Sequence, residues 1–246
     1  MGKTEESAEK EDLAAQMRTS LAKVRGLRPA AIPSEAPMRM RLREWQSARF
    51  ARTYPDLLAS ERYCLAAEFF LSDLYGPKDF SHRDEELERI LPMLGRLLPA
   101  AGVHTIALGM ELDILSETFD IAMARALLAQ GPSLKSGISE ATYAKAYRTC
   151  DDRPGREAQI DLLIQIGATL DRVTRKPLLK AAISLMKGPA HAAGLGALHD
   201  FLARGFQAFE RMKGATEFLD TIRTRETLIL QRLFAGHKAP FDLERP

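Results

Sequence analysis

The sequence has only two cysteines, Cys64 and Cys150, and they lie far apart along its 246 residues. Because they form neither a CxxC pair nor a cysteine–histidine spacing, we expect no disulfide framework and no structural zinc site. No apolar run approaches the roughly 18–20 residues that a membrane-spanning helix needs. The polar, acidic N-terminus also lacks the features of a signal peptide. These absences predict a soluble, cytoplasmic protein without a membrane span.

Signals for β-structure and for well-known catalytic motifs are missing as well. The chain has no Asn-Gly or Asp-Gly hairpin turn and no alternation of polar and β-branched residues. It has no P-loop, no glycine-rich dinucleotide turn and no nucleophile elbow. We also find no internal repeat with the period of a solenoid. Without a catalytic signature, we lean against an enzyme.

Alanine and leucine are abundant, and 46% of the residues are apolar, which favours helices. We expect an all-α fold: a single irregular bundle of about eight or nine helices with a flexible N-terminal arm. Residues 1–37 would hold the polar arm, one helix and a proline-rich connector, and residues 38–246 the helical domain. One helix is expected over residues 56–75, and another would begin at Pro189 and end near residue 212.

One stretch of the chain carries a recognisable motif, Phe69-Phe70-Leu71-Ser72-Asp73-Leu74-Tyr75-Gly76. It resembles an uncharacterised bacterial family named for its FFLEELY motif, whose two glutamates are replaced here by Ser72 and Asp73. The likeness continues through residues 77–84 and includes Leu115-Ser116-Glu117 and Arg225-Glu226. The resemblance implies a helical fold and no particular activity.

The motif leads into a corner between two expected helices, and this corner is rich in polar side chains. As a functional site, it would form the polar lip of a pocket for a ligand or partner. The candidate residues at this corner are Asp73, Tyr75, Lys78, Asp79, Arg83 and Asp84. A structural interpretation is also open, in which Asp84 suits the helix dipole and Arg83 pairs with Asp79.

Two glutamates, Glu68 and Glu226, fall among apolar residues of the expected helices. A buried carboxylate needs a partner, because an unpaired buried charge is very costly. We expect Arg62, Arg83 or Arg225 to supply that partner. Glu68, Arg225 and Glu226 are therefore candidate site residues, either as structural ion pairs or as functional groups.

Charge is unevenly distributed, although the net charge is only +2. Residues 63–120 are strongly acidic, and Asp113, Glu117 and Asp120 fall on one face of their expected helix. Because no Glu-x-x-His pair accompanies these acids, we do not expect a carboxylate-bridged di-metal site. The acidic stripe is interpreted as a face that is either solvated or paired with arginine.

The expected helix over residues 38–54 is strongly basic and also holds two aromatic residues, Trp45 and Phe50. Its arginines are Arg39, Arg41, Arg43, Arg49 and Arg52. Such a pattern can bind the phosphates of nucleic acid or of anionic lipid. The same arginines can instead meet the acidic residues 63–120 inside the fold, so we do not expect nucleic acid as a partner.

Histidines are few, and only His104, His191 and His199 are weak candidates for ligands of haem or a metal ion. Small residues surround His191 and His199, and these would let a flat cofactor approach. The His199-Asp200 pair is also similar to the pair that helical HD phosphohydrolases use. The five histidines make no metal-ligand spacing, however, and we expect no cofactor.

We therefore predict a non-enzymatic binding or interaction protein that recognises an apolar ligand or a partner helix in a cleft between helices. Its partner could be a small molecule, another protein or a second copy of the chain. The alternative is a cofactor-carrying protein or an enzyme that uses His191, His199 or the carboxylates Glu68 and Glu226.

Overall fold

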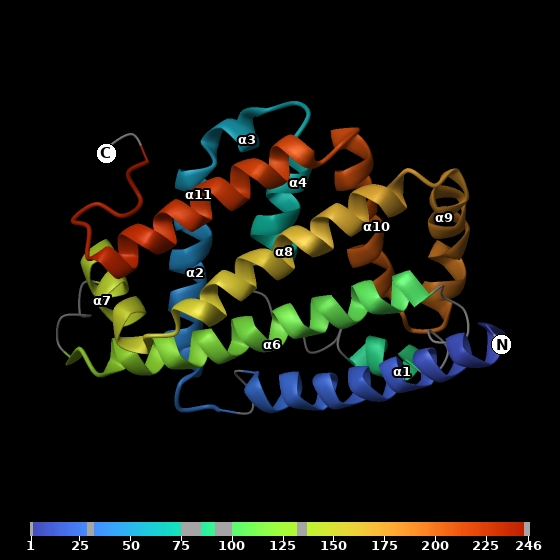
Figure 1. Ribbon diagram of the computed structural model, residues 1–246, viewed down its shortest axis with the longest axis horizontal. Helices are drawn as coiled ribbons and strands as arrows, with labels where there is room; N and C mark the ends of the chain where they lie inside the picture. The colour runs from blue at the N-terminus through green and yellow to red at the C-terminus, as the bar shows by residue number, and fades with distance from the viewer. Residues whose placement is uncertain (1, 29–31, 75–84, 92–99, 132–136, 244–246) are drawn as a thin grey trace.

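The computed structural model describes residues 2–28, 32–74, 85–91, 100–131 and 137–243 (Figure 1). Throughout these ranges the regular structure is helical and no β-strand occurs, which confirms the all-α prediction. No helix in the same ranges is both long enough and apolar enough to cross a bilayer.

The helices differ greatly in length and follow one another closely along the chain. Their bounds, in chain order, are α1 (Gly2–Leu27), α2 (Ala36–Thr53), α3 (Pro55–Ala59), α4 (Cys64–Phe69), the π-helical turn η2 (Phe70–Leu74), α6 (Ala100–Leu128), α7 (Glu140–Cys150), α8 (Arg153–Thr174), α9 (Pro177–Ala192), α10 (Gly196–Met212) and α11 (Thr216–Ala235). Residues 85–91 form a further helical stretch.

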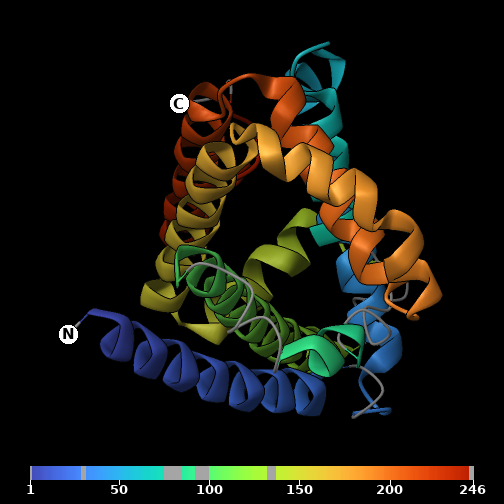
Figure 2. The same cartoon turned by 90° about the vertical axis from the view of Figure 1, so that its right-hand side faces the viewer.

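Several long helices pack against helices that are not their direct neighbours in the chain. Helix α1 lies along α6, α6 packs against α8, and α8 packs against α11, as Figures 1 and 2 show. Helix α10 contacts α4, α8 and α9. Helix α6 contacts α1, α2, α7 and α8, and α8 in turn contacts α9, α10 and α11.

The helix expected over residues 56–75 is divided in the structure, so that prediction was wrong. Helix α3 ends at Ala59 because Ser60 is extended, with φ −77° and ψ 124°. The chain then turns, α4 begins at Cys64, and residues 70–74 adopt the wider turn η2. This division brings the labelled helical segments in the described part of the chain to eleven, above the predicted eight or nine.

Two other boundaries differ from the prediction. Helix α1 starts at Gly2, so the segment expected to be a flexible arm is helical, in keeping with its many glutamate, lysine and alanine residues. Helix α9 continues through Pro189 to Ala192, and the chain breaks at Gly194, where φ is +68°. Glycine adopts this left-handed conformation without a steric penalty, so the chain can turn at this point. Helix α10 therefore begins after the turn, at Gly196 and not at Pro189.

The largest hydrophobic cluster joins α2, α4, α8, α10 and α11. Near its centre Phe70 stacks on Phe50, with ring centroids 6.4 Å apart, and meets Phe218 edge-on at 5.5 Å. The adjacent Phe69 packs against Phe201 of α10, with centroids 5.4 Å apart. Both phenylalanines of the sequence motif are therefore core residues.

A glycine in α8 sets the distance between α8 and α11. A Cβ at Gly167 would lie 2.5 Å from Cδ2 of Leu219, which is closer than packed carbon atoms allow. We therefore expect Gly167→Ala to lower the free energy of unfolding by about 1–3 kcal/mol, the usual cost of overpacking.

The matched control is Gly109→Ala in α6, because a Cβ at Gly109 would meet no atom within 4 Å. This substitution should raise the free energy of unfolding by up to about 1 kcal/mol, since alanine favours helix over glycine. Urea unfolding followed by circular dichroism measures both variants, and equal effects would contradict the packing argument.

Candidate functional site

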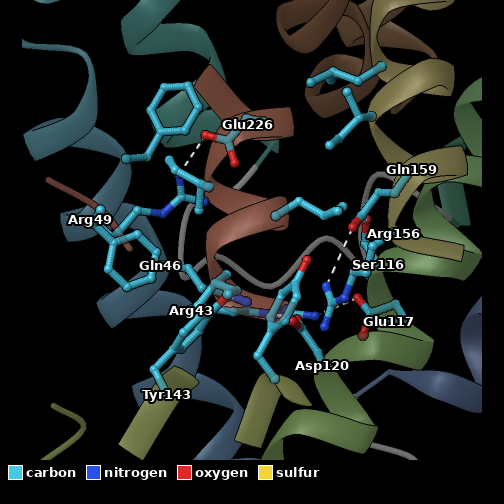
Figure 3. Close-up of a pocket in the computed structure, with 18 of the residues that line it drawn as sticks. Arg43, Gln46, Arg49, Ser116, Glu117, Asp120, Tyr143, Arg156, Gln159 and Glu226 are labelled. Carbon is cyan, nitrogen blue, oxygen red and sulfur yellow. Dashed lines mark hydrogen bonds and ion pairs between the residues drawn. The ribbon is translucent and has the colours of Figure 1, made fainter. Parts of the chain in front are cut away.

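A cavity of about 110 Å³ lies between α2, α6, α7, α8 and α11. Figure 3 shows its lining, which combines charged and polar side chains with aliphatic and aromatic ones. The charged residues at the cavity are Arg28, Arg43, Arg49, Asp113, Glu117, Asp120, Arg156 and Glu226. Charged side chains in the interior of a protein need partners of opposite charge. Most of these side chains form ion pairs with one another.

The carboxylate of Glu117 on α6 is the centre of the charged network. The residue is almost completely buried, with 1% of its surface exposed. Its Oε1 accepts hydrogen bonds from Arg28 Nη1 and, at 2.6 Å, from Arg43 Nη2, while its Oε2 accepts one from Arg39 Nη2. Arg28 follows α1 and the other two arginines lie one turn apart on α2, so a single carboxylate ties α6 to both segments.

Two further carboxylates extend this network along α6. Arg28 Nη2 donates to Asp113 Oδ2 at 2.8 Å, and Arg43 Nε donates to Asp120 Oδ2 at 2.8 Å. Burial raises the pKa of Asp120, and the neighbouring Arg43 acts in the opposite direction. The acidic stripe is thus paired with arginine in the interior, which was one of the two alternatives left open by its spacing. Arg39 and Arg43 accordingly pack inside the fold.

Glu226 on α11 belongs to a separate ion pair at the cavity. Its Oε1 accepts hydrogen bonds from Arg49 Nη1 at 2.5 Å and from the Tyr54 hydroxyl at 2.8 Å (Figure 3 shows the first). Burial raises the pKa of Tyr54, and Glu226 raises it further, so the hydroxyl stays protonated and donates. Burial acts to lower the pKa of Arg49, but Glu226 outweighs it and raises that pKa.

Of the three arginines predicted to pair with Glu226, Arg83 lies outside the described residues and the other two have other partners. Arg225 donates two hydrogen bonds of 2.7 Å each to the carboxylate of Asp56. Arg62 donates to the backbone oxygen of Met212 at 2.7 Å. Adjacent residues on a helix point about 100° apart, so Arg225 and Glu226 pair with different residues of opposite charge. The prediction of an ion pair for Glu226 holds, but its partner is Arg49.

Arg156, near the start of α8, differs from the other arginines at the cavity. Its guanidinium lies 3.9 Å from the ring centroid of Phe119 and 4.5 Å from that of Tyr147. Its Nη1 donates a long hydrogen bond of 3.5 Å to Gln159, which in turn donates to Ser116 at 2.9 Å. Among the described residues, no carboxylate pairs with Arg156 and its Nη2 has no hydrogen-bond partner, although the residue is only 7% exposed.

Among the described residues, Arg156 gives this group one positive charge more than it has negative charges. The remaining arginines equal the carboxylates in number: Arg28, Arg39, Arg43 and Arg49 face Asp113, Glu117, Asp120 and Glu226. A buried cation without a counter-charge costs free energy, and the two aromatic rings offset only part of that cost. The arrangement therefore favours the approach of an anion.

Sequence reasoning did not single out Arg156, although a signal for it exists. Arg156, Ile160 and Leu163 recur at i, i+4 and i+7 and all line the cavity. An arginine within the apolar face of an amphipathic helix is the pattern expected of a buried cation.

The sequence matches a family model described as Domain of unknown function (DUF8198) over residues 27–240. The chain belongs to this family. No curated protein and no solved structure matches the chain. The DUF8198 match contains every charged residue of the cavity, from Arg28 to Glu226, whereas α1 lies almost entirely before it. The charged lining of the cavity therefore lies within the part of this chain that matches the family model.

Other predicted site residues of this DUF8198 protein lie away from the cavity. Glu68 is exposed on α4, because that helix buries Ala67 and Phe69 instead, so the prediction of a buried carboxylate there was wrong. Asp73 is buried and accepts two hydrogen bonds from Arg204, at 2.6 and 3.2 Å. The other candidates of that corner, Tyr75, Lys78, Asp79, Arg83 and Asp84, lie outside the described residues.

The structure brings two of the three candidate histidines together. His191 and His199 both lie within hydrogen-bond distance of one carboxylate oxygen of Asp200, at 3.0 and 3.3 Å. His104 is exposed on α6 and takes no part in this cluster.

Removal of the Glu117 charge from this DUF8198 protein would leave Arg28, Arg39 and Arg43 close together without their shared counter-ion. We expect Glu117→Gln to lower the free energy of unfolding by about 3–5 kcal/mol, the usual cost of breaking a buried ion pair. Glu111→Gln, at an exposed position on the same helix, should change it by no more than about 0.5 kcal/mol. Urea unfolding compares the two, and similar losses in both would contradict a central role for Glu117.

Proposed function

We propose that this protein is a non-enzymatic binding protein whose interior cavity takes a small carboxylate with a short apolar tail. The observation that carries the proposal is Arg156, a buried arginine at the cavity whose Nη2 has no partner among the described residues. A carboxylate is a fitting ligand for a guanidinium, because its two oxygens match the planar fork of N–H donors.

The balance of charge favours a ligand with one negative charge. Since the other arginines of the network are matched by carboxylates, a monoanion would neutralise Arg156 without displacing an existing ion pair. A second negative charge in the same small cavity would be repelled by Glu117 and Glu226. A wholly apolar ligand would leave the cation without a counter-charge, so the lining favours a carboxylate over the apolar ligand expected from the sequence.

The size of the cavity and its apolar lining limit the rest of the ligand. An engineered cavity of about 150 Å³ holds benzene, so a cavity of 110 Å³ suits a carboxylate of roughly four to six non-hydrogen atoms. The apolar residues at the cavity are Phe50, Ile160, Leu163, Ile229, Leu230, Leu233 and Phe241. Acetate, propionate and butyrate cover this range of size and have apolar tails of increasing length.

The way in which Glu117 is held supports a role in binding rather than in acid–base catalysis. Both of its carboxylate oxygens accept hydrogen bonds from arginines, Oε1 from Arg28 and Arg43 and Oε2 from Arg39. A general base must have an oxygen within reach of the proton that it takes from the substrate. A carboxylate held between guanidinium groups is suited to fixing the shape of a site instead.

Isothermal titration calorimetry with acetate, propionate and butyrate, in a buffer free of other organic acids, tests the proposal. We expect saturable binding of at least one of these acids and no binding of butyramide, which has a similar shape without the charge. Arg156→Met should weaken binding about 10- to 100-fold, because a hydrogen bond to a charged group contributes about 1.5–3 kcal/mol.

Arg153→Met is the matched control, because Arg153 lies one turn earlier on α8, is half exposed and pairs with Glu157. This variant should keep the affinity of the wild type. Failure of all three acids to bind, or an equal loss of affinity in both variants, would contradict the proposal.

The stability of Arg156→Met without ligand separates a binding role from a structural one. Because the substitution removes a buried charge that has no partner, the variant should be at least as stable as the wild type. Thermal unfolding in acid-free buffer measures this difference. A marked loss of stability would instead assign Arg156 to the scaffold.

A further inference from the structure

The corner between α9 and α10 brings together three side chains with metal-ligating atoms, away from the cavity. His191 lies in the last turn of α9, and His199 and Asp200 lie near the start of α10. Asp200 Oδ1 is 3.0 Å from His191 Nε2 and 3.3 Å from His199 Nδ1, and the three ligand atoms lie within 4.8 Å of one another. In the described part of the chain, no other group of three histidine, cysteine or acidic side chains is so placed.

His199 is held so that one ring nitrogen points at this cluster. Its Nε2 lies 2.9 Å from the backbone oxygen of Ile183, which can only accept a hydrogen bond, so Nε2 carries the proton. In the neutral ring, Nδ1 then presents a lone pair to Asp200, and two acceptors face each other at 3.3 Å. A cation between them removes this repulsion. A hydrogen bond from the far nitrogen to a backbone carbonyl is also typical of metal-bound histidines.

The helical stretch of residues 85–91 also contacts the corner between α9 and α10. Glu86, in the helical stretch before α6, is buried, and its carboxylate accepts hydrogen bonds from the N–H groups of Ala197 at 3.3 Å and Leu198 at 2.6 Å. Arg89 of the same stretch donates to the backbone oxygen of Gly194 in the turn between the helices. The turn and the start of α10, which bears His199 and Asp200, are therefore held in place independently of the cluster.

Glycine at position 196 makes room for the ring of His191. A Cβ there would lie 3.0 Å from His191 Nδ1 and 3.1 Å from Cε1, so a larger residue would push the ring outward. The absence of a side chain thus allows His191 to lie against the start of α10, beside Asp200.

We propose that His191, His199 and Asp200 bind one divalent transition-metal ion, with Zn²⁺ as the preferred ion. Two imidazole nitrogens and one carboxylate oxygen are an established ligand set for Zn²⁺. With bonds of about 2.0–2.1 Å, the ligand atoms of a tetrahedral zinc ion lie roughly 3.3 Å apart. The two separations from Asp200, 3.0 and 3.3 Å, are close to this value. Water completes the coordination, since the side chains of His191 and Asp200 are 45% and 42% exposed.

The ion fixes the end of α9, which has few other attachments. Helix α9 packs mainly on α10 and makes a smaller contact with α8. Its Leu178, Leu185 and Met186 are exposed, so the helix gains little stability from burial. A metal ion that bridges His191 to His199 supplies the missing attachment. His191, His199 and Asp200 do not line the cavity. The proposed metal site can therefore be tested independently of carboxylate binding.

Titration of the full-length protein without an affinity tag, with Zn²⁺ in competition with a chromophoric chelator, tests the site. We expect one ion per chain, and Co²⁺ in its place should give the intense visible absorption of a four-coordinate ion. His191→Ala and Asp200→Asn should each weaken Zn²⁺ binding by at least about 10- to 100-fold. Both positions are partly exposed, so these variants keep the test informative even where a change at His199 disturbs folding.

His104→Ala is the matched control, because it removes an exposed histidine outside the cluster. It should leave the affinity for Zn²⁺ unchanged. Hydrogen exchange gives a second readout: Zn²⁺ should slow the exchange of backbone amides in α9 of the wild type and not in His191→Ala. Absence of saturable binding, unchanged affinity in both cluster variants, or loss of affinity in His104→Ala would overturn the proposal.

Discussion

Glu117 holds its carboxylate in the interior among three guanidinium groups that come from two other parts of the chain. Each of these charges alone would be very costly away from water, and they are tolerated only as a complete set. The segment after α1 and helices α2 and α6 must therefore meet in one register, since sliding any of them by a turn would leave a charge without its partner. Apolar side chains such as Leu42 tolerate small shifts in a way that these ion pairs do not.

The cavity follows from the same constraint. Guanidinium and carboxylate groups meet at fixed distances and angles, so the side chains around them cannot close up as freely as an apolar core does. Arg156 reaches this region from α8, and its flat guanidinium is placed by Phe119 and Tyr147 rather than by an acid. One site thus combines carboxylates that are paired with arginines and an arginine, Arg156, that has no carboxylate partner among the described residues.

The sequence predicted the features that depend on neighbours along a helix, because periodicity reports them directly. The helical class and the grouping of Asp113, Glu117 and Asp120 on one face of α6 belong to this group, although their spacing left open whether that face is solvated or paired with arginine. It did not predict that Arg49 would pair with Glu226, because these residues are 177 positions apart and no local pattern records their contact. Glu68 was misjudged for a related reason: apolar neighbours on both sides in sequence do not decide which face of a short helix is buried. His191, His199 and Asp200 come together because of the turn between α9 and α10. The spacing of the two histidines in the sequence does not reveal the geometry of that turn.

The π-helical turn η2 sets the direction in which Asp73 faces. Each hydrogen-bonded ring of a π-helix holds one residue more than that of an α-helix, so the side chains of this turn are offset from the positions that α-helical spacing would give them. An offset of one residue corresponds to about 100° around the helix axis. With the wider turn, Asp73 is buried and pairs with Arg204 on α10. The ion pair that joins η2 to α10 therefore depends on the shape of the backbone as well as on the two charges.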